Sequence, residues 1–229
     1  MRTAVFLSGQ PRNVERAYPY IYEHLLEPNN PDVFIHCWFD PEIDTGQAYI
    51  NAGGHVASHP IPIGIDRIIK RLYTPKLSTF EKQIQFDEKN YNERRYPAIR
   101  PFFSISQRYS ILQSTMLKTQ WEYEQGFTYD VVVRLRFDYA LYDTIYLDRY
   151  DVRFLNLPNR CPHPNAVDDT FAFSSSRNMN IYADLYNHLD EYYNKDGIVF
   201  CDEHLLNHHL LKNKLEIRKY NIRYDLLRD

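Results

Sequence analysis

Charged side chains end the most hydrophobic segment of the chain. In the stretch YDVVVRLRFDYAL, at positions 129–141, a run of valines is followed by Arg134, Arg136 and Asp138. Arginine donates paired hydrogen bonds to phosphate oxygens, and a carboxylate can hold a divalent cation that bridges the same phosphates. The pattern therefore predicts a site for a nucleotide diphosphate, with Asp138 as the candidate metal ligand. The alternative is a structural ion pair between one arginine and Asp138.

A second polar group follows the first apolar run of the chain. The run at 3–7 is stopped by SGQPR, which supplies Ser8, Gly9, Gln10 and Arg12. The backbone amides of such a turn can contact a base or ribose, and Arg12 can reach a phosphate. The turn lacks both the G-x-G-x-x-G spacing of a dinucleotide fingerprint and the G-x-x-x-x-G-K-[ST] spacing of a P-loop. We assign these four residues to the nucleotide side of the predicted site.

Two acidic motifs in the second half of the chain are candidates for the sugar side. VDDTFAFSSS places Asp168 and Asp169 ahead of a predicted strand, where paired carboxylates either orient sugar hydroxyls or cap a turn. DEHLLNHH places Glu203, His204 and His208 on a predicted helix. Glu203 is a candidate general base, or else an acid that favours the helix dipole. The two histidines are spaced to hold a metal, but the pattern is not H-E-x-x-H.

Strands that alternate with helices are expected to position these groups. A strand at 3–7, a helix at about 13–26 and a strand at 32–38 form a βαβ unit, which requires a parallel sheet. A helix at about 104–126 leads into the strand at 130–135. Further elements are predicted as a strand at 169–174, helices at 178–193 and 200–213, and a strand with an irregular tail at 215–229. Ligands of open α/β sheets bind beyond the carboxyl ends of the strands, so the polar groups should share one crevice.

The segment 41–101 is the least regular part of the sequence. Its first part, 41–58, is loop-like in composition, and 65–82 is typical of a short helix followed by a strand. We expect a single domain over residues 1–229, in which 41–101 is an insert or loop-rich region.

Composition limits the classes of function. A net charge of -3 gives no global basic field, which disfavours a protein that tracks nucleic acid. The 3 cysteines have no C-x-x-C spacing, which argues against a disulfide framework and a cysteine zinc site. No apolar run approaches the roughly 20 residues that span a bilayer, and the first run is too short for a signal peptide. We expect a soluble, cytoplasmic protein without a transmembrane segment.

Four regions of the sequence, taken in order, resemble glycosyltransferases of the GT-A type, which use nucleotide-diphosphate sugars. The regions are AVFLSGQPRN with DVFIHCWFD, YDVVVRLRFDYAL, DDTFAFSSSRNMNIYADLY and DEHLLNHHL. The chain is similar to polysaccharide and viral glycosyltransferases with an R-x-R-x-D strand end. The resemblance implies a GT-A-like, Rossmann-like α/β/α sandwich with a mostly parallel central sheet. It also implies transfer of a sugar from a nucleotide-diphosphate donor to a glycan acceptor, in the synthesis of a surface polysaccharide or another glycan.

The resemblance assigns the donor side of the site. In the family, a D-x-D strand end binds Mn²⁺ or Mg²⁺ together with the donor diphosphate. Here the motif falls on Arg136 to Asp138, with arginine in place of the first acid. Arg136 would then neutralise diphosphate charge, while Asp138 alone holds a metal or a ribose hydroxyl.

The resemblance also assigns the acceptor side. Asp168, Asp169 and His204 would lie near the sugar and the acceptor. An inverting enzyme would use Glu203, or else Asp169, as the base that removes the proton of the acceptor hydroxyl. A retaining enzyme needs no such base, and the sequence leaves both stereochemical outcomes open.

Two other classes of protein compete with this interpretation. A non-catalytic carbohydrate-binding module would use some of the 20 tyrosines as stacking platforms. A nucleotidyltransferase would require a glycine-rich first loop with a lysine, and SGQPRN supplies one glycine and no lysine.

Overall fold

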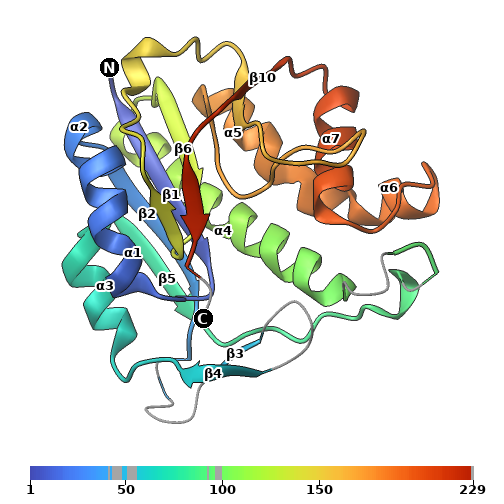
Figure 1. The fold of residues 1–229 in the computed structure, drawn as a ribbon, viewed down its shortest axis with the longest axis horizontal. Coiled ribbons are helices and arrows are strands. Elements are labelled where there is room, and N and C mark those ends of the chain that lie inside the picture. The colour runs from blue at the N-terminus through green and yellow to red at the C-terminus, as the bar shows by residue number, and fades with distance from the viewer. Residues whose placement is uncertain (41, 43–47, 51–55, 92, 96–99, 228–229) are drawn as a thin grey trace.

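A mostly parallel sheet of seven strands, flanked by helices, organises the chain (Figure 1). The structure is a computed structural model, and it describes residues 1–40, 42, 48–50, 56–91, 93–95 and 100–227. The strand order is β10-β8-β9-β6-β1-β2-β5. The strands are β1 (Thr3–Gly9), β2 (Asp32–Trp38), β5 (Leu77–Glu81), β6 (Val131–Leu135), β8 (Leu155–Pro158), β9 (Ala172–Ser174) and β10 (Ile217–Tyr220). The predicted α/β class with a mostly parallel central sheet is therefore confirmed.

One strand of this sheet, β9, runs in the direction opposite to the other six. β1 runs parallel to both β2 and β6, and β2 runs parallel to β5. β9 is antiparallel to its neighbours β6 and β8, and β10 is parallel to β8. Because β9 runs against β6, the start of β9 lies at the edge where β1 and β6 end: Ala172 is level with Arg134.

Both faces of the central strands are buried. In β1, Val5 and Leu7 face one core, and Ala4 and Phe6 face the other. A strand buried on both faces needs apolar residues at successive positions, which explains the continuous run at the start of the sequence. In β6 the alternation sends Val133 to the first core, whereas its even-numbered neighbours face the second.

Helices cover the two faces of the sheet as separate layers (Figure 1). The first core lies under α1 (Val14–Ile21) and α3 (Ile65–Tyr73), and the second under α4 (Pro101–Gln125), α5 (Ser176–Ala183), α6 (Leu189–Asn194) and α7 (Asp202–Lys212). A short α2 (Glu27–Asn29) precedes β2.

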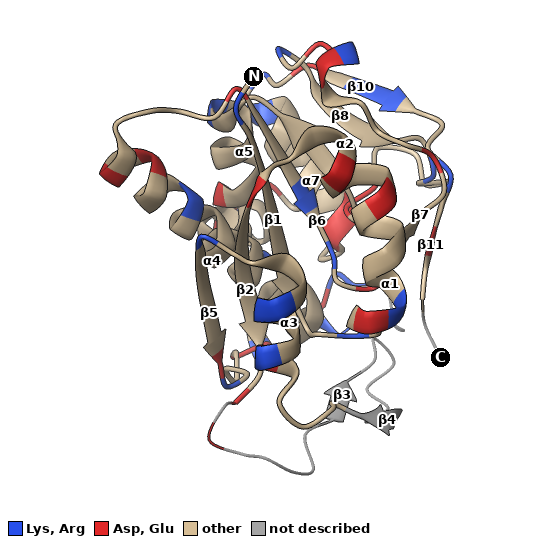
Figure 2. Ribbon diagram, turned by 90° about the vertical axis from the view of Figure 1, so that its left-hand side faces the viewer, with Lys and Arg blue, Asp and Glu red and all other residues tan. Residues whose placement is uncertain are grey.

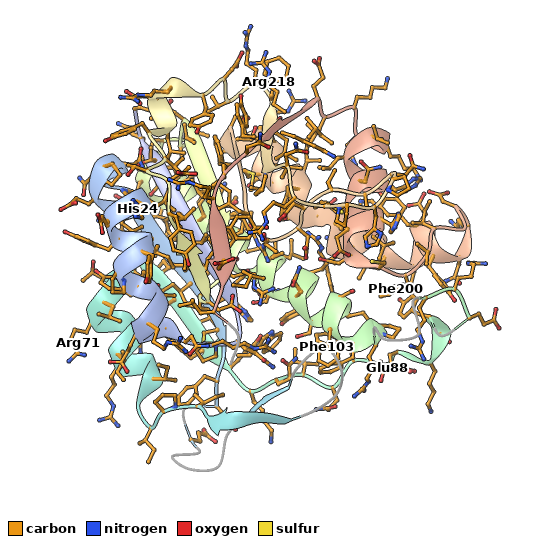
Figure 3. All side chains as sticks on the ribbon, in the orientation of Figure 1. His24, Arg71, Glu88, Phe103, Phe200 and Arg218 are labelled. Atoms are coloured by element: carbon orange, nitrogen blue, oxygen red, sulfur yellow. The ribbon has the colours of Figure 1, made fainter. Side chains whose placement is uncertain are left out.

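The long helix α4 has defined signals at both ends. Its first residue is Pro101, whose missing N–H would be unpaired there in any case. The carboxylate of Glu88 accepts a hydrogen bond from the backbone N–H of Phe102, 3.1 Å away, at the helix start (Figure 3). At the other end Gly126 adopts φ 68°, which terminates the helix in the left-handed region that glycine tolerates.

Two predicted helices are interrupted. The helix predicted at 13–26 contains α1 and then a π-helical turn, Tyr22–Leu26, in which the N–H of Glu27 bonds to the carbonyl of Tyr22. The helix predicted at 178–193 is divided into α5, a 3-10 segment (Asp184–His188) and α6. The interruption ends at His188, whose backbone dihedrals of φ -113° and ψ 2° depart from helical values just before α6 begins.

The loop-rich interpretation of 41–101 is wrong in part. β3 (Ala48–Ile50) and β4 (Val56–Pro60) form an antiparallel pair within the stretch that looked loop-like. The short helix and strand expected at 65–82 are α3 and β5, and β5 is an edge strand of the main sheet. A 3-10 turn (Lys89–Tyr91) follows. Residues 41, 43–47, 51–55, 92 and 96–99, which also belong to this segment, lie outside the described residues.

Three strands have no counterpart in the sequence prediction. β8 completes the sheet beside β9, while β7 (Tyr139–Leu141) and β11 (Tyr224–Leu226) form a separate antiparallel pair. A 3-10 turn (Leu147–Arg149) lies between β7 and β8. β7 and β11 are each 3 residues long, too short for a visible alternation of apolar and polar residues.

Acidic and basic residues are interspersed along the ribbon (Figure 2), and their charges sum to a net charge of -3. Within the part of the chain that the structure describes, no helix combines the length and the apolar content that a membrane crossing demands.

A buried lysine joins α4 to α5. The side chain of Lys118 is fully buried, and its Nζ donates to Glu122, Ser176 and Asn180 over 2.8, 2.6 and 2.8 Å. Burial lowers the pKa of Lys118, and the bonded Glu122 carboxylate opposes that effect. Glu122 in turn accepts the backbone N–H of Tyr129, so the network fixes the start of β6 as well.

We expect Lys118→Met to lower the free energy of unfolding by about 3 to 5 kcal/mol, because it leaves the Glu122 carboxylate buried without its charge partner. Urea denaturation of both proteins measures the change. Lys212→Met is the control: Lys212 contacts two carboxylates, whereas Lys118 contacts one, but the Lys212 side chain is 40% exposed, so its loss should lower stability much less. Equal losses in the two variants would contradict this account.

Candidate functional site

The sheet has a topological switch point between β1 and β6. From β1 the chain proceeds to β2 on one side, and it returns to β6 on the other. Ligands of open α/β sheets bind at such a point, beyond the carboxyl ends of the two strands. Leu7 pairs with Leu135, so the next residues of β1 and β6 reach this edge together. The SGQPR turn and the end of the R-x-R-x-D motif therefore meet, as the sequence predicted.

Arg136 and Asp138 form a bidentate ion pair at the end of β6. Nε and Nη2 of Arg136 donate to the two carboxylate oxygens of Asp138 over 2.8 and 2.6 Å. Asp138 is 2% exposed, whereas the Arg136 side chain is 18% exposed. Burial lowers the pKa of Arg136, but the Asp138 carboxylate outweighs it and raises that pKa. The structural ion pair that the sequence left as an alternative is thus present.

A second group of acids and arginines lies on the α4 side of the same edge. We call it the carboxyl cluster: Gln107, Arg108, Arg134, Asp169 and Asp202. Arg108 of α4 donates from Nε and Nη2 to the two oxygens of Asp202, at the start of α7, over 2.8 and 2.7 Å. Gln107 donates to both aspartates, and Arg134 of β6 donates to the backbone carbonyl of Asp169.

The two aspartates of the carboxyl cluster share a proton. Burial raises the pKa of Asp202, and the neighbouring Asp169 anion adds to that effect against the pull of Arg108, so that the pKa reaches about 8. Burial also acts to raise the pKa of Asp169, but the hydrogen bond with Asp202, together with Arg108 and Arg134, lowers it to about 2. Two carboxyl groups in contact cannot both ionise freely, so the pair retains one proton near neutral pH.

A cavity of about 350 Å³ opens beside the carboxyl cluster. Its walls come from the segment before β9, from the start of α7 and from β11. The lining residues are Arg160, Cys161, Pro162, His163, Asp168, Asp169, Thr170, Glu203, Tyr224 and Leu226. Asp169 belongs both to this wall and to the carboxyl cluster, and it is only partly buried.

The predicted sugar-side residue Asp168 stabilises its own turn. One of its oxygens accepts from the backbone N–H and the hydroxyl of Thr170 over 2.8 and 2.5 Å. The other oxygen accepts from the hydroxyl of Tyr224 over 2.5 Å. The ring of Tyr224 stacks on Tyr139, with ring centroids 4.3 Å apart, and the guanidinium of Arg160 lies 4.3 Å above it. Asp168 is therefore the anchor that holds β11 against the cavity.

Glu203 and His204, on the first turn of α7, occupy different surroundings. Glu203 lines the cavity, and its carboxylate accepts a hydrogen bond from the thiol of Cys201 over 2.8 Å. The ring of His204 lies 6.3 Å from that of His163, between ring centroids. His208 instead bonds to Asp196 over 2.8 Å. In the described residues, His204 and His208 do not form part of a metal-binding group.

The SGQPR turn is stabilised by its own side chains. Nε and Nη2 of Arg12 donate to the side-chain oxygen of Gln10 over 3.0 and 2.6 Å. Gly9 adopts φ 105°, a conformation that other residues rarely adopt, and a Cβ built there would meet no atom within 4 Å. The hydroxyl of Ser8 is buried and has no hydrogen-bond partner in the described part of the chain. The turn thus presents backbone to an open space at the switch point.

The residues at the D-x-D position do not fit a divalent cation. Both oxygens of Asp138 are already bonded to Arg136, and the side chain is nearly inaccessible. No group of three acidic, histidine or cysteine side chains suited to a metal occurs among the described residues. A cation at Asp138 would have to displace a guanidinium that already satisfies the carboxylate.

Several residues of the site were not predicted as such. Gln107 and Arg108 lie on α4, whose buried residues also include Lys118 and Glu122, so a polar or charged residue on this helix did not by itself mark a site. Asp202 lies at the start of a predicted helix, where an acidic residue is expected because it interacts favourably with the helix dipole. Tyr224 gave no signal, because its role depends on contact with residues far away in sequence.

A second polar array, behind the switch point, resembles a hydrolase triad in its order of contacts. His36 of β2 bonds through Nδ1 to the hydroxyl of Ser110 and through Nε2 to Glu81, each over 2.7 Å. Ser110 is fully buried in α4 beneath the sheet. A nucleophile must reach its substrate, so this array joins β2, α4 and β5 and does not form a hydrolytic site.

Comparison of the chain with protein-family models and with curated proteins gives no match in either case. The class of protein is therefore assigned from the fold and from the residues at the edge of its sheet. It is an α/β protein with a Rossmann-like sheet, and an acid–arginine site lies at its switch point.

We expect the carboxyl cluster to make stability depend on pH. The folded-state pKa of Asp202 lies above its unfolded value, so the native state binds more protons between the two values. The contribution is complete below the unfolded pKa and is lost as pH rises toward about 8. Asp169→Asn removes the charge that holds this proton, so its free energy of unfolding should fall less steeply between about pH 5 and pH 8.

Urea denaturation across this range measures the two slopes, which one proton limits to about 1.4 kcal/mol per pH unit. Asp151→Asn is the control, because Asp151 is a partly exposed aspartate outside the carboxyl cluster, and its hydrogen bond with Arg153 lowers its pKa to about 2. It should leave the slope unchanged. Parallel curves for wild type and Asp169→Asn would exclude a shared proton.

Proposed function

We propose that the chain is a glycosyltransferase with a GT-A-like fold, which transfers a sugar from a nucleotide-diphosphate donor to a hydroxyl of a glycan acceptor. The observation that carries the proposal is the position of the site. Arginines and carboxylates meet at the switch point of a mostly parallel sheet, and a cavity adjoins them on the side of β9 and α7.

The donor is best accommodated across the ends of β1 and β6. The turn after β1 offers backbone groups at Gly9 for the nucleoside, and Arg136 offers a guanidinium for the diphosphate. Arg134 is 1% exposed and bonds to the carbonyl of Asp169, so it positions the carboxyl cluster and does not contact the donor. The cavity then receives the sugar and the acceptor beside the diphosphate.

Asp169 is the better candidate for the base. The reacting anomeric carbon is bonded to the diphosphate, so the base must lie close to the group that binds phosphate. Asp169 lines the cavity, lies close enough to Arg136 to raise the pKa of that guanidinium, and is kept ionised by its own pKa of about 2. Glu203 lines the same cavity and is the second candidate, but no phosphate-binding arginine of the strand ends is among its contacts in the described residues.

In the proposed transfer one bond forms, one bond breaks and one proton moves. Asp169 accepts the proton of the acceptor hydroxyl as that oxygen bonds to the anomeric carbon. The bond between that carbon and the diphosphate oxygen breaks, and the nucleotide diphosphate leaves with the electron pair. Arg136 stabilises the negative charge that develops on the leaving group. This sequence inverts the anomeric configuration.

The first test is donor binding. Calorimetric titration with UDP-, GDP- and CDP-sugars should detect at least one donor, and no binding of any of them would sink the proposal. With the donor that binds, product release on a panel of glycan acceptors measures turnover. Binding of glycans without turnover of any donor would favour a non-catalytic carbohydrate-binding module.

We expect Asp169→Asn to lower kcat by about 10²- to 10⁴-fold, because removal of a general base typically costs that much. Donor affinity should remain within about threefold, since Asp169 acts on the acceptor. Glu203→Gln should lower kcat much less, and Asp151→Asn, outside the cavity, should leave it unchanged. A larger loss for Glu203→Gln than for Asp169→Asn would transfer the role of base to Glu203.

A further inference from the structure

We propose that Arg136 occupies the role that a divalent cation would otherwise have, and that Asp138 fixes its guanidinium so that it binds a nucleotide diphosphate without metal. The inference rests on the proposed function and specifies how the donor is held. It concerns the ends of β1 and β6 and is carried by three observations: the geometry of the pair, the charge around it and the neighbouring hydroxyl of Ser8.

The geometry leaves most of the guanidinium available. An arginine has five N–H donors, and Asp138 accepts from Nε and from Nη2 of Arg136. Nη1 of Arg136 makes no hydrogen bond with any residue that the structure describes, and its side chain is 18% exposed while Asp138 is 2% exposed. The carboxylate thus holds one edge of the guanidinium from the protein side and leaves its remaining donors on the open side.

The charge balance around the pair favours an anion. Three arginines, Arg108, Arg134 and Arg136, meet three aspartates at this edge. Because Asp169 and Asp202 retain one proton between them, these six side chains together carry one more positive charge than negative charge. A diphosphate adds negative charge where this excess lies. A divalent cation would raise the excess further.

The hydroxyl of Ser8 is an independent sign of a ligand beside Arg136. Leu7 of β1 is level with Leu135 of β6, so Ser8 and Arg136 are each the next residue of adjacent strands. Ser8 is 5% exposed, and its Oγ has no hydrogen-bond partner among the described residues. Buried hydroxyls are almost always bonded, so an unpartnered one at a switch point marks a position for an acceptor oxygen.

The chain contains a matched pair for comparison. Asp151 and Arg153 have the same spacing in the opposite order, and Arg153 donates from Nε and Nη2 to the two oxygens of Asp151. The Arg153 side chain is 84% exposed and lies away from the switch point. Substitution there changes the same charges and the same kind of ion pair, and so controls for general effects of charge.

The experiment uses calorimetry to compare the binding of nucleoside monophosphates with the binding of nucleoside diphosphates. The probes are UMP and UDP, GMP and GDP, and CMP and CDP, each with EDTA and again with MnCl₂. We expect one diphosphate to bind in EDTA at least tenfold more tightly than its monophosphate, with less than a threefold gain from Mn²⁺. Charge-assisted hydrogen bonds to one phosphate group account for a factor of this size.

Two variants test the role of Arg136. Arg136→Lys keeps the charge but loses the planar fork, and should reduce the preference for the diphosphate several-fold. The double variant Arg136→Gln/Asp138→Asn keeps a hydrogen-bonded pair without charge, so it avoids a buried, unpaired carboxylate and should fold. In it the diphosphate should bind no better than the monophosphate. The matched double variant Asp151→Asn/Arg153→Gln should retain the full preference.

The outcomes separate this inference from the proposed function. Diphosphate binding that requires Mn²⁺, or that survives both Arg136 variants in EDTA, overturns the arginine site and leaves a glycosyltransferase in place. Binding of no nucleotide at all overturns the proposed function together with the inference. Binding in EDTA that is lost in the Arg136 variants, and kept in the Asp151 and Arg153 control, establishes the cation-independent site.

Discussion

The burial of two guanidinium groups beneath the edge of the sheet constrains the rest of the structure. Arg108 and Arg134 are 0% and 1% exposed, and a charge removed from water must be paired and hydrogen-bonded where it lies. Arg108 therefore requires Asp202 at the start of α7, and Arg134 requires the carbonyl of Asp169 ahead of β9. These contacts fix α7 to α4, and the segment ahead of β9 to β6. The site is the place where they meet.

Much of the fold follows from local sequence because its central strands are buried on both faces. Continuous apolar runs such as 32–38 identify the parallel strands, and the helix periodicity between them identifies the βαβ units. The failures occur where local pattern gives no information. β7 and β11 pair residues more than 80 positions apart, and the helix predicted at 178–193 is divided by a 3-10 segment that its apolar spacing does not reveal. Contacts of this kind exist only in the folded chain.

The candidate site was predictable to the extent that it lies at strand ends. Arg136, Asp138 and the SGQPR turn follow parallel strands, and the structure brings them to one edge. The pairing of Arg136 with Asp138 was one of two readings that the spacing allowed, and only the folded geometry selects it. Arg108 could not be assigned from sequence, because a basic residue in a helix is more often exposed. Its burial depends on how α4 crosses the sheet.

The direction of β9 determines which residues around this strand reach the ligand edge of the sheet. A parallel strand delivers to the ligand edge the residues that follow it, but an antiparallel strand delivers the residues that precede it. Asp168 and Asp169 come before β9, so their carboxylates reach the edge ahead of the strand, and the carbonyl of Asp169 accepts a hydrogen bond from Arg134 of β6. One reversed strand thus supplies the edge with acceptors, and it complements the donors that β1 and β6 provide.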